Sequence, residues 1–251
     1  MTIEHSGSGD VNRSLALLWE LDDRRSRGPK PKLSLDDIVV TAIEIADADG
    51  LEAVSMRRLA KALGVGTMSL YRYVPGKAEL LDLMLDRVFE TDPTSPRALD
   101  DWRGFLEDMG HAMWELYTSH AWLPQVDQTR PVLGPRALAG LEFALQHLTD
   151  LALPDAYKIQ AISAIETLAS AAARLHNNAI AAERDSGRTD EEFWRAQEPV
   201  LMKAMNSGRF PMMASLADDA FAGGGAELFE FGLQRLLDGL DVLVDQRVAS
   251  P

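Results

Sequence analysis

Apolar residues recur every three or four positions over most of this 251-residue chain, which is the periodicity of amphipathic helices. The first well-delimited example covers residues 34–50. Ser34, with Asp37 three residues later, predicts a capping box at its start, and Gly50 predicts its end. This segment is therefore predicted to be a helix.

Three further helices are expected close behind it. Ser55 is the predicted N-cap of a helix that ends at Gly64, a short helix covers 67–73, and a longer one covers 76–90. The Gly-Val-Gly linker between the first two is so short that they must meet at a steep angle. Two short helices joined by such a turn form the helix-turn-helix pattern.

The rest of the chain also reads as helical. A proline-containing segment at 91–100 indicates a domain boundary, and helical periodicity resumes in the stretches 101–120, 135–151, 155–185, 190–205 and 226–248. We therefore predict an all-α fold, with a three-helix helix-turn-helix domain over 34–90 and a larger helical domain over 91–251. Residues 1–33 are predicted to be a flexible N-terminal extension, in which the apolar stretch 13–21 could form a short helix.

The charged residues are unevenly distributed along the chain. The formal net charge is −14, yet residues 24–77 hold ten Lys and Arg against six Asp and Glu. Residues 78–251 hold 14 basic and 28 acidic residues. A basic N-terminal module on an acidic body indicates a polyanionic partner for that module alone.

Other features of the sequence narrow the class of protein. The chain has no cysteine, no apolar run near the ~18 residues of a membrane span, and no basic-then-apolar leader pattern. We therefore expect a cytoplasmic protein without disulfides, membrane contact, cofactor or metal site.

The short helix 67–73 carries residues that suit DNA rather than a core. Thr67 and Ser69 are small hydrogen-bonding residues that permit close approach to base edges, and Met68 suits a thymine methyl group. The other candidates for base or phosphate contact are Tyr71, Arg72, Tyr73 and Lys77. The sequence leaves open whether Arg72 reads a base, binds a phosphate or only adds charge.

Several motifs occur together between residues 34 and 88: Gly50-Leu51, Ser55 before Arg57, LAKALGV, SLYRYV, and Lys77 followed by Glu-Leu-Leu at 79–81. In this span the chain resembles the DNA-binding domain of the tetracycline-repressor (TetR) family of bacterial one-component regulators. The resemblance implies that Lys77 holds the DNA backbone and that the other DNA contacts come from Arg57, Thr67, Met68, Ser69, Tyr71 and Tyr73. Tyr73 stands where the family often has histidine, so its contact is expected to differ.

The resemblance also extends to the ends of the chain. The basic arm formed by Arg24, Arg25, Arg27, Lys30 and Lys32 resembles extensions found in a subset of the family, and we expect it to reach a neighbouring groove or backbone. By resemblance, the C-terminal domain holds a small hydrophobic effector and a two-helix dimer face.

Candidate effector-binding residues are the polar and aromatic side chains His111, Trp114, Tyr117, His147, His176 and Asn177. For each of them, a place in the core or an interface is the alternative. The alanine-rich stretch 155–185 and the helix 226–248 suit a four-helix dimer bundle, and the alternative is packing within one subunit.

The function expected from these features is a homodimeric repressor that binds a palindromic operator and is released by a small molecule. An activator, or a helical protein-interaction module of the same fold, is the alternative. An enzyme is not expected, because the sequence has no glycine-rich phosphate loop and no strand that would support a nucleophile.

Overall fold

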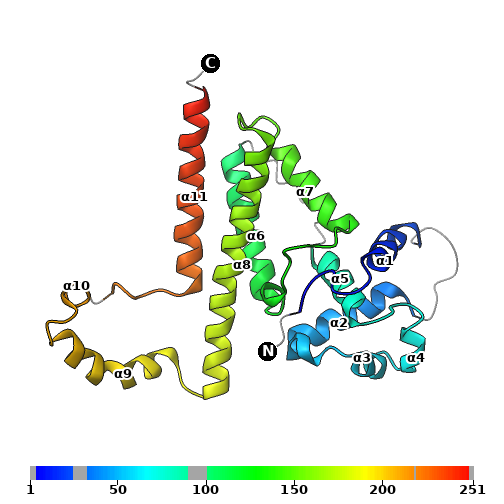
Figure 1. Ribbon diagram of the computed structural model, residues 1–251, viewed down its shortest axis with the longest axis horizontal. Coiled ribbons are helices and arrows are strands. Elements are labelled where there is room, and N and C mark those ends of the chain that lie inside the picture. Colours follow the sequence, from blue (N-terminus) through cyan, green and yellow to red (C-terminus); the bar gives the residue numbers. More distant parts are fainter. Residues whose placement is uncertain (1–3, 25–32, 90–100, 218, 249–251) are drawn as a thin grey trace.

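The computed structural model describes residues 4–24, 33–89, 101–217 and 219–248 (Figure 1). Within these ranges the chain forms helices and one isolated bridge between His5 and Asp127, with no strand. The predicted all-α fold is confirmed.

The N-terminal part contains α1 (Val11–Arg24), α2 (Leu35–Asp49), the 3-10 helix η1 (Leu51–Ala53), α3 (Met56–Ala62), α4 (Thr67–Leu70) and α5 (Lys77–Val88). The predicted capping box at the start of α2 is present, since Ser34 accepts from the Asp37 N–H and Asp37 accepts from the Ser34 N–H. One prediction about this region is wrong. The helix expected over 67–73 ends at Leu70, and the three residues that follow form a turn.

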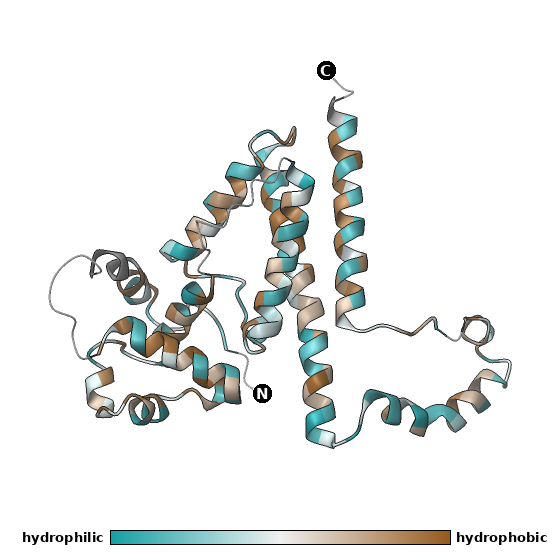
Figure 2. Cartoon of the chain, turned by 180° about the vertical axis from the view of Figure 1, so that it is seen from behind, coloured by the Kyte–Doolittle hydropathy of each residue, from teal (hydrophilic) through white to brown (hydrophobic). Residues whose placement is uncertain are grey.

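The C-terminal part contains α6 (Trp102–Ser119), the 3-10 helix η2 (Leu123–Gln125), α7 (Pro135–His147), α8 (Asp155–Ser186), α9 (Asp190–Met205), α10 (Pro211–Ala214) and α11 (Gly225–Val248). Helices α6, α8 and α11 pack on one another, whereas α9 and α10 extend away from them (Figure 1). None of the described residues from 187 to 224 is buried. Apolar residues are nevertheless frequent there and along α11 (Figure 2).

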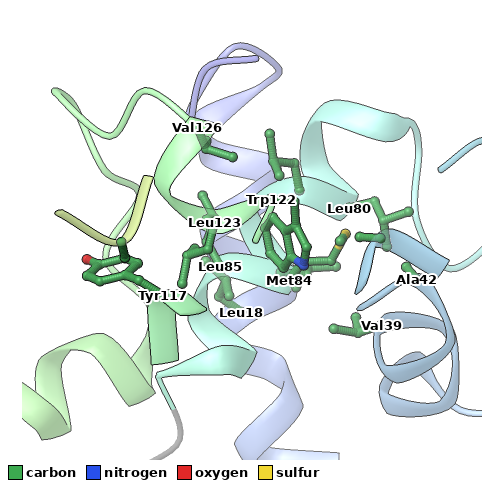
Figure 3. Close-up of a cluster of buried hydrophobic side chains, with 14 of the residues drawn as sticks. Leu18, Val39, Ala42, Leu80, Met84, Leu85, Tyr117, Trp122, Leu123 and Val126 are labelled. Carbon is green, nitrogen blue, oxygen red and sulfur yellow. The ribbon is translucent and has the colours of Figure 1, made fainter. Parts of the chain in front are cut away.

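One hydrophobic core joins the two parts. Figure 3 shows Leu18 of α1, Val39 of α2 and Met84 of α5 in the same cluster as Trp122 and Leu123, which follow α6. Trp122 is 2% exposed. The helix-turn-helix part and the C-terminal part are therefore held together by buried apolar surface as well as by the chain.

Helix α5 lies at the centre of this junction. Its eight residues from Glu79 to Asp86 are all buried. Among them are three carboxylates, and a buried carboxylate is costly unless it is paired or hydrogen-bonded. These three carboxylates therefore need hydrogen-bond donors from other parts of the chain.

The donors for Asp82 come from the segment before and within α1. The Ser6 hydroxyl and the Gly7 N–H donate to Asp82 Oδ1 over 3.0 and 2.9 Å, and the Ser14 hydroxyl donates to Oδ2 over 2.7 Å. Glu79 likewise accepts from the Asp10 N–H over 3.1 Å. The prediction of a flexible extension is therefore wrong for residues 4–10, because two buried carboxylates of α5 hold this segment in place.

The donors for Asp86 come from the first turn of α7. The N–H groups of Arg136 and Ala137 donate to Asp86 Oδ1 over 3.1 and 3.0 Å, so Asp86 caps a helix of the other domain. Gly134 allows this approach, since a Cβ there would collide with the Asp86 carboxylate. Burial raises the pKa of Asp86, and the donors on α7 partly offset that rise.

No helix within the described ranges is both long and apolar enough to cross a membrane.

Replacing Asp86 with alanine should lower the free energy of unfolding by about 2 kcal/mol, because two buried N–H groups at the start of α7 lose their acceptor. Asp86→Asn should cost less, since its amide oxygen can still accept. Urea denaturation followed by circular dichroism measures both. Asp150→Ala, at an exposed position, is the control, and an Asp86→Ala variant as stable as that control would contradict the capping role.

Candidate nucleic-acid interface

The helix-turn-helix is built on a small buried core. Leu59 of α3, Leu70 of α4 and Val74 are each fully buried at 0% exposure. The Ser55 hydroxyl accepts from the Arg58 N–H over 3.3 Å and begins α3 as predicted. The apolar residues at these spacings therefore fix the two helices, and the polar residues between them face outwards.

The turn between α3 and α4 is a Schellman motif. The Val65 N–H donates to the Ala60 carbonyl over 3.0 Å, and the Gly64 N–H donates to the Lys61 carbonyl over 3.3 Å. Gly64 has a φ of +66°, which glycine adopts without strain. The glycine predicted to end α3 thus also sets the direction in which α4 leaves.

Helix α4 presents its first residues to the outside. The Met68 side chain is 77% exposed, which is unusual for a large apolar residue, and it lies between the partly exposed Thr67 and Ser69. Leu70 points inwards. The three residues predicted to approach base edges therefore stand together on one exposed turn.

The turn after α4 arranges the remaining candidates differently from a helix. The Tyr73 N–H donates to the Leu70 carbonyl over 2.8 Å, and Pro75 disfavours helix for the residue before it. Tyr71 is 44% exposed, whereas Tyr73 is partly buried against the core. Arg72 is exposed, and its guanidinium donates to the Ser69 hydroxyl over 3.4 Å.

The basic residues around this surface differ in their partners. Arg57, at the start of α3, is exposed and makes no ion pair within the described part of the chain. Arg58 pairs with Asp49. Lys77 pairs with Glu4, with Nζ 2.8 Å from Oε1, so its ammonium is already engaged.

The basic arm lies almost wholly outside the described residues. Arg24 ends α1, and Arg25, Arg27, Lys30 and Lys32 fall in the range 25–32 that the structure does not describe.

Sequence reasoning missed a polar contact between this module and the C-terminal part. Asp47, in the last turn of α2, accepts from Trp122 Nε1 over 2.8 Å, and His120 Nδ1 lies 2.8 Å from the same oxygen. His120 and Trp122 directly follow α6. No periodicity in the sequence links residues 75 positions apart, so only the tertiary structure reveals this contact.

Three of the six candidate effector residues come together around α11. Trp114 stacks on Phe229 with ring centroids 5.1 Å apart, and His176 lies 5.5 Å from Trp114. His111 meets Phe229 edge-on, and its Nε2 is 2.9 Å from Glu230 Oε1. Phe229 is 1% exposed, while the other three rings are partly exposed.

Tyr117 and Asn177 form a second group beside this one. The Tyr117 hydroxyl donates to Glu166 Oε1 over 3.2 Å, and the Asn177 amide donates to the Tyr117 carbonyl over 2.9 Å. Burial raises the pKa of both Tyr117 and Glu166, and the hydrogen bond from Tyr117 partly offsets the rise for Glu166. Burial thus disfavours the charged form of each group, whereas the hydrogen bond from Tyr117 favours the charged form of Glu166.

His147 belongs to a separate cluster on α7. Its ring stacks on Phe105 with centroids 4.5 Å apart and lies 4.4 Å from Phe143. The structure thus divides the six candidates among three groups: the cluster around Trp114, the hydrogen-bonded pair of Tyr117 and Asn177, and the cluster around His147. No group of three or more His, Asp or Glu side chains among the described residues is arranged to hold a metal ion.

A groove of about 330 Å³ runs between α8 and α11. Its lining is mainly apolar or small: Tyr157, Gln160, Ala161, Ala164, Ile165, Arg235, Leu236, Gly239, Leu240 and Leu243. An open, mainly apolar groove therefore lies between the two helices that were predicted to form a dimer face.

Comparison with known proteins extends over both parts of the chain. Residues 38–84 match the family model of bacterial regulatory proteins of the tetR family, and residues 94–244 match that of the tetracyclin repressor-like C-terminal domain. The chain is 54% identical to the HTH-type transcriptional repressor DrrR1 of Streptomyces coeruleorubidus over 246 residues, which covers 97% of this chain and 90% of DrrR1.

Solved structures of ActR from Streptomyces coelicolor are similar to this fold. Apo ActR aligns with a TM-score of 0.68 and 29% identity over 87% of this chain and 99% of ActR. ActR in complex with actinorhodin aligns with a TM-score of 0.68 and 30% identity over 86% of this chain and 99% of ActR.

Proposed function

Because this chain is a helix-turn-helix repressor of the TetR family, we propose that it binds a palindromic operator as a homodimer and that a small hydrophobic effector releases it. The observation that carries the DNA-binding half of this proposal is the exposed turn Thr67–Ser69 with Met68 at its tip. An apolar side chain so exposed, on the first turn of a recognition helix, suits contact with a thymine methyl in the major groove. We place this action in the cytoplasm.

Phosphate contacts would fix the register of α4 on the DNA. Arg57, Tyr71 and Arg72 are all exposed around α4 and carry donors suited to phosphate oxygens. Tyr73 is partly buried, so we assign it a supporting contact through its hydroxyl. The basic arm from Arg24 to Lys32 would add contacts beyond the groove that α4 occupies.

Homodimerisation is supported by the groove between α8 and α11. Ala161, Ala164 and Gly239 allow a second helix to approach closely. The same two helices also carry exposed apolar side chains, including Leu175 at 54%, Phe231 at 64% and Val242 at 56%. A second copy would cover this surface and place two copies of α4 in successive major grooves ~34 to 36 Å apart.

We propose that the effector binds against the partly exposed rings of the cluster around Trp114, those of His111, Trp114 and His176. The solved complexes of ActR with actinorhodin and with (S)-DNPA support a small organic ligand in a domain of this fold. Trp114 and His176 offer ring faces for such a ligand, and Tyr117 and Asn177 lie beside them with polar groups. Release from DNA requires that the ligand bind the DNA-incompetent arrangement more tightly.

Arg72→Ala should weaken operator binding by about 1 to 3 kcal/mol without lowering stability, because the exposed guanidinium has only one weak internal hydrogen bond. Fluorescence anisotropy with a labelled operator, selected from a random DNA pool by the wild-type protein, measures the dissociation constant. Arg184→Ala on α8 removes the same charge far from α4 and is the control. Equal binding by wild type and Arg72→Ala would refute this assignment of the DNA-binding face.

Gly239→Arg should convert the dimer to a folded monomer. A Cβ at Gly239 meets no atom of its own chain within 4 Å, so the larger side chain fits this subunit but fills the groove. Gly239→Ala adds a Cβ alone and should remain dimeric. Sedimentation velocity separates the two states, and a dimeric Gly239→Arg protein would show that the subunits meet elsewhere.

Trp114→Ala should require about tenfold more actinorhodin to release the labelled operator, since a lost aromatic contact is worth roughly 1 to 1.5 kcal/mol. Trp19→Ala, which removes a 47% exposed indole from α1, is the control. A Trp114→Ala protein that responds like wild type would exclude this cluster as the ligand site. A wild-type complex that resists saturating actinorhodin would exclude that compound as effector.

A further inference from the structure

Lys77 lies at the first position of α5, where a cation is unfavourable. The N–H groups at a helix N-terminus carry partial positive charge, and the N-cap residue Gly76 has no side chain to accept from them. Such a position favours an anion nearby. The first turn of α5 contains the carboxylate of Glu79, and the Lys77 ammonium pairs with a second carboxylate, that of Glu4, with Oε1 2.8 Å from Nζ.

The backbone of Glu4 is held by the C-terminal domain. The Asp127 N–H donates to the Glu4 carbonyl and the Ser6 N–H donates to the Asp127 carbonyl, each over 3.0 Å. The Val132 N–H donates to the Ser6 hydroxyl over 3.3 Å. The Glu4 carboxylate therefore contacts the DNA-binding module, while the backbone of its segment is hydrogen-bonded to the C-terminal domain.

Two of the three N–H donors of the Lys77 ammonium are in use. One donates to Glu4 and one to the Leu51 carbonyl over 3.2 Å. An operator phosphate at this place would compete with the Glu4 carboxylate for the same protons. A carboxylate that stayed beside a bound phosphate would also repel it.

We propose that Glu4 is an autoinhibitory residue, whose carboxylate occupies Lys77 in the DNA-free protein and must be displaced by an operator phosphate. This inference rests on the proposed operator binding and adds to it the backbone contact by Lys77 that the family resemblance implies. Because Asp127 and Val132 bind this segment, the C-terminal domain influences whether a phosphate can replace Glu4 on Lys77. A shift of the loop 127–132 changes the position of Glu4 and, with it, the availability of Lys77.

The size of the effect follows from the exposure of the pair. The side chains of Lys77 and Glu4 are 33% and 35% exposed, so solvent screens their attraction. Pairs of this kind change an equilibrium by about two- to fivefold. The carboxylate thus lowers operator affinity without abolishing it.

Full-length Glu4→Gln tests the proposal against the operator selected by the wild-type protein. It should bind about two- to fivefold more tightly at 0.1 M salt. The slope of log K against log salt should stay close to that of the wild type, because Lys77 reaches the same phosphate in both complexes. Glu44→Gln, which removes the same charge from an exposed position on α2, is the matched control. If both variants bind the operator more tightly by the same factor, the gain in affinity comes from net charge alone, and the proposal is overturned.

Lys77→Met and the double variant separate this inference from the proposed function. Lys77→Met alone should weaken binding and flatten the salt slope, and adding Glu4→Gln to it should change nothing further. If Lys77→Met weakens binding while Glu4→Gln alone has no effect, the autoinhibitory role is wrong and the proposed function stands. If Lys77→Met binds like wild type, Lys77 makes no DNA contact and both that contact and this inference fail. Thermal denaturation confirms that each variant is folded.

Discussion

The burial of two aspartates within α5 is the constraint on which the rest of the structure depends. Asp82 and Asp86 are 1% and 2% exposed, so each must accept hydrogen bonds from other parts of the chain. Asp82 draws in the segment before α1, and Asp86 caps α7. Since α5 follows the helix-turn-helix directly, these bonds tie the DNA-binding module to the N-terminal segment and to the effector domain at once.

A second connection runs through the end of α6. Asp47 on α2 accepts from Trp122, and the apolar face of Trp122 lies in the core shared by both domains. Trp114 and Tyr117 stand on α6 a few residues before this contact. A ligand that shifted α6 would therefore move a group bonded directly to α2. Such movement changes DNA affinity only when the ligand prefers one of the two arrangements.

The single chain leaves much apolar surface uncovered. Met212 and Phe221 in the segment between α9 and α11 are 77% and 72% exposed, and no described residue from 187 to 224 is buried. Exposed apolar patches of this extent are typical of interaction surfaces. The groove between α8 and α11 belongs to the same half of the molecule. This exposed apolar surface supports the proposed homodimer.

The sequence by itself determined most of the helices and predicted the DNA-binding surface, because both depend on neighbours in the chain. Periodicity, the Ser34–Asp37 capping box and Gly64 locate the helix-turn-helix, and Thr67, Met68 and Ser69 mark its exposed face. The run Glu-Leu-Leu-Asp-Leu-Met-Leu-Asp at 79–86 also held a signal, since a helix apolar on every side must bury its acids. Only the tertiary structure decided which groups those acids bind, how the effector candidates divide among three groups, and that Glu4 pairs with Lys77. Those contacts join residues about 40 to 120 positions apart, and no local pattern specifies their pairing.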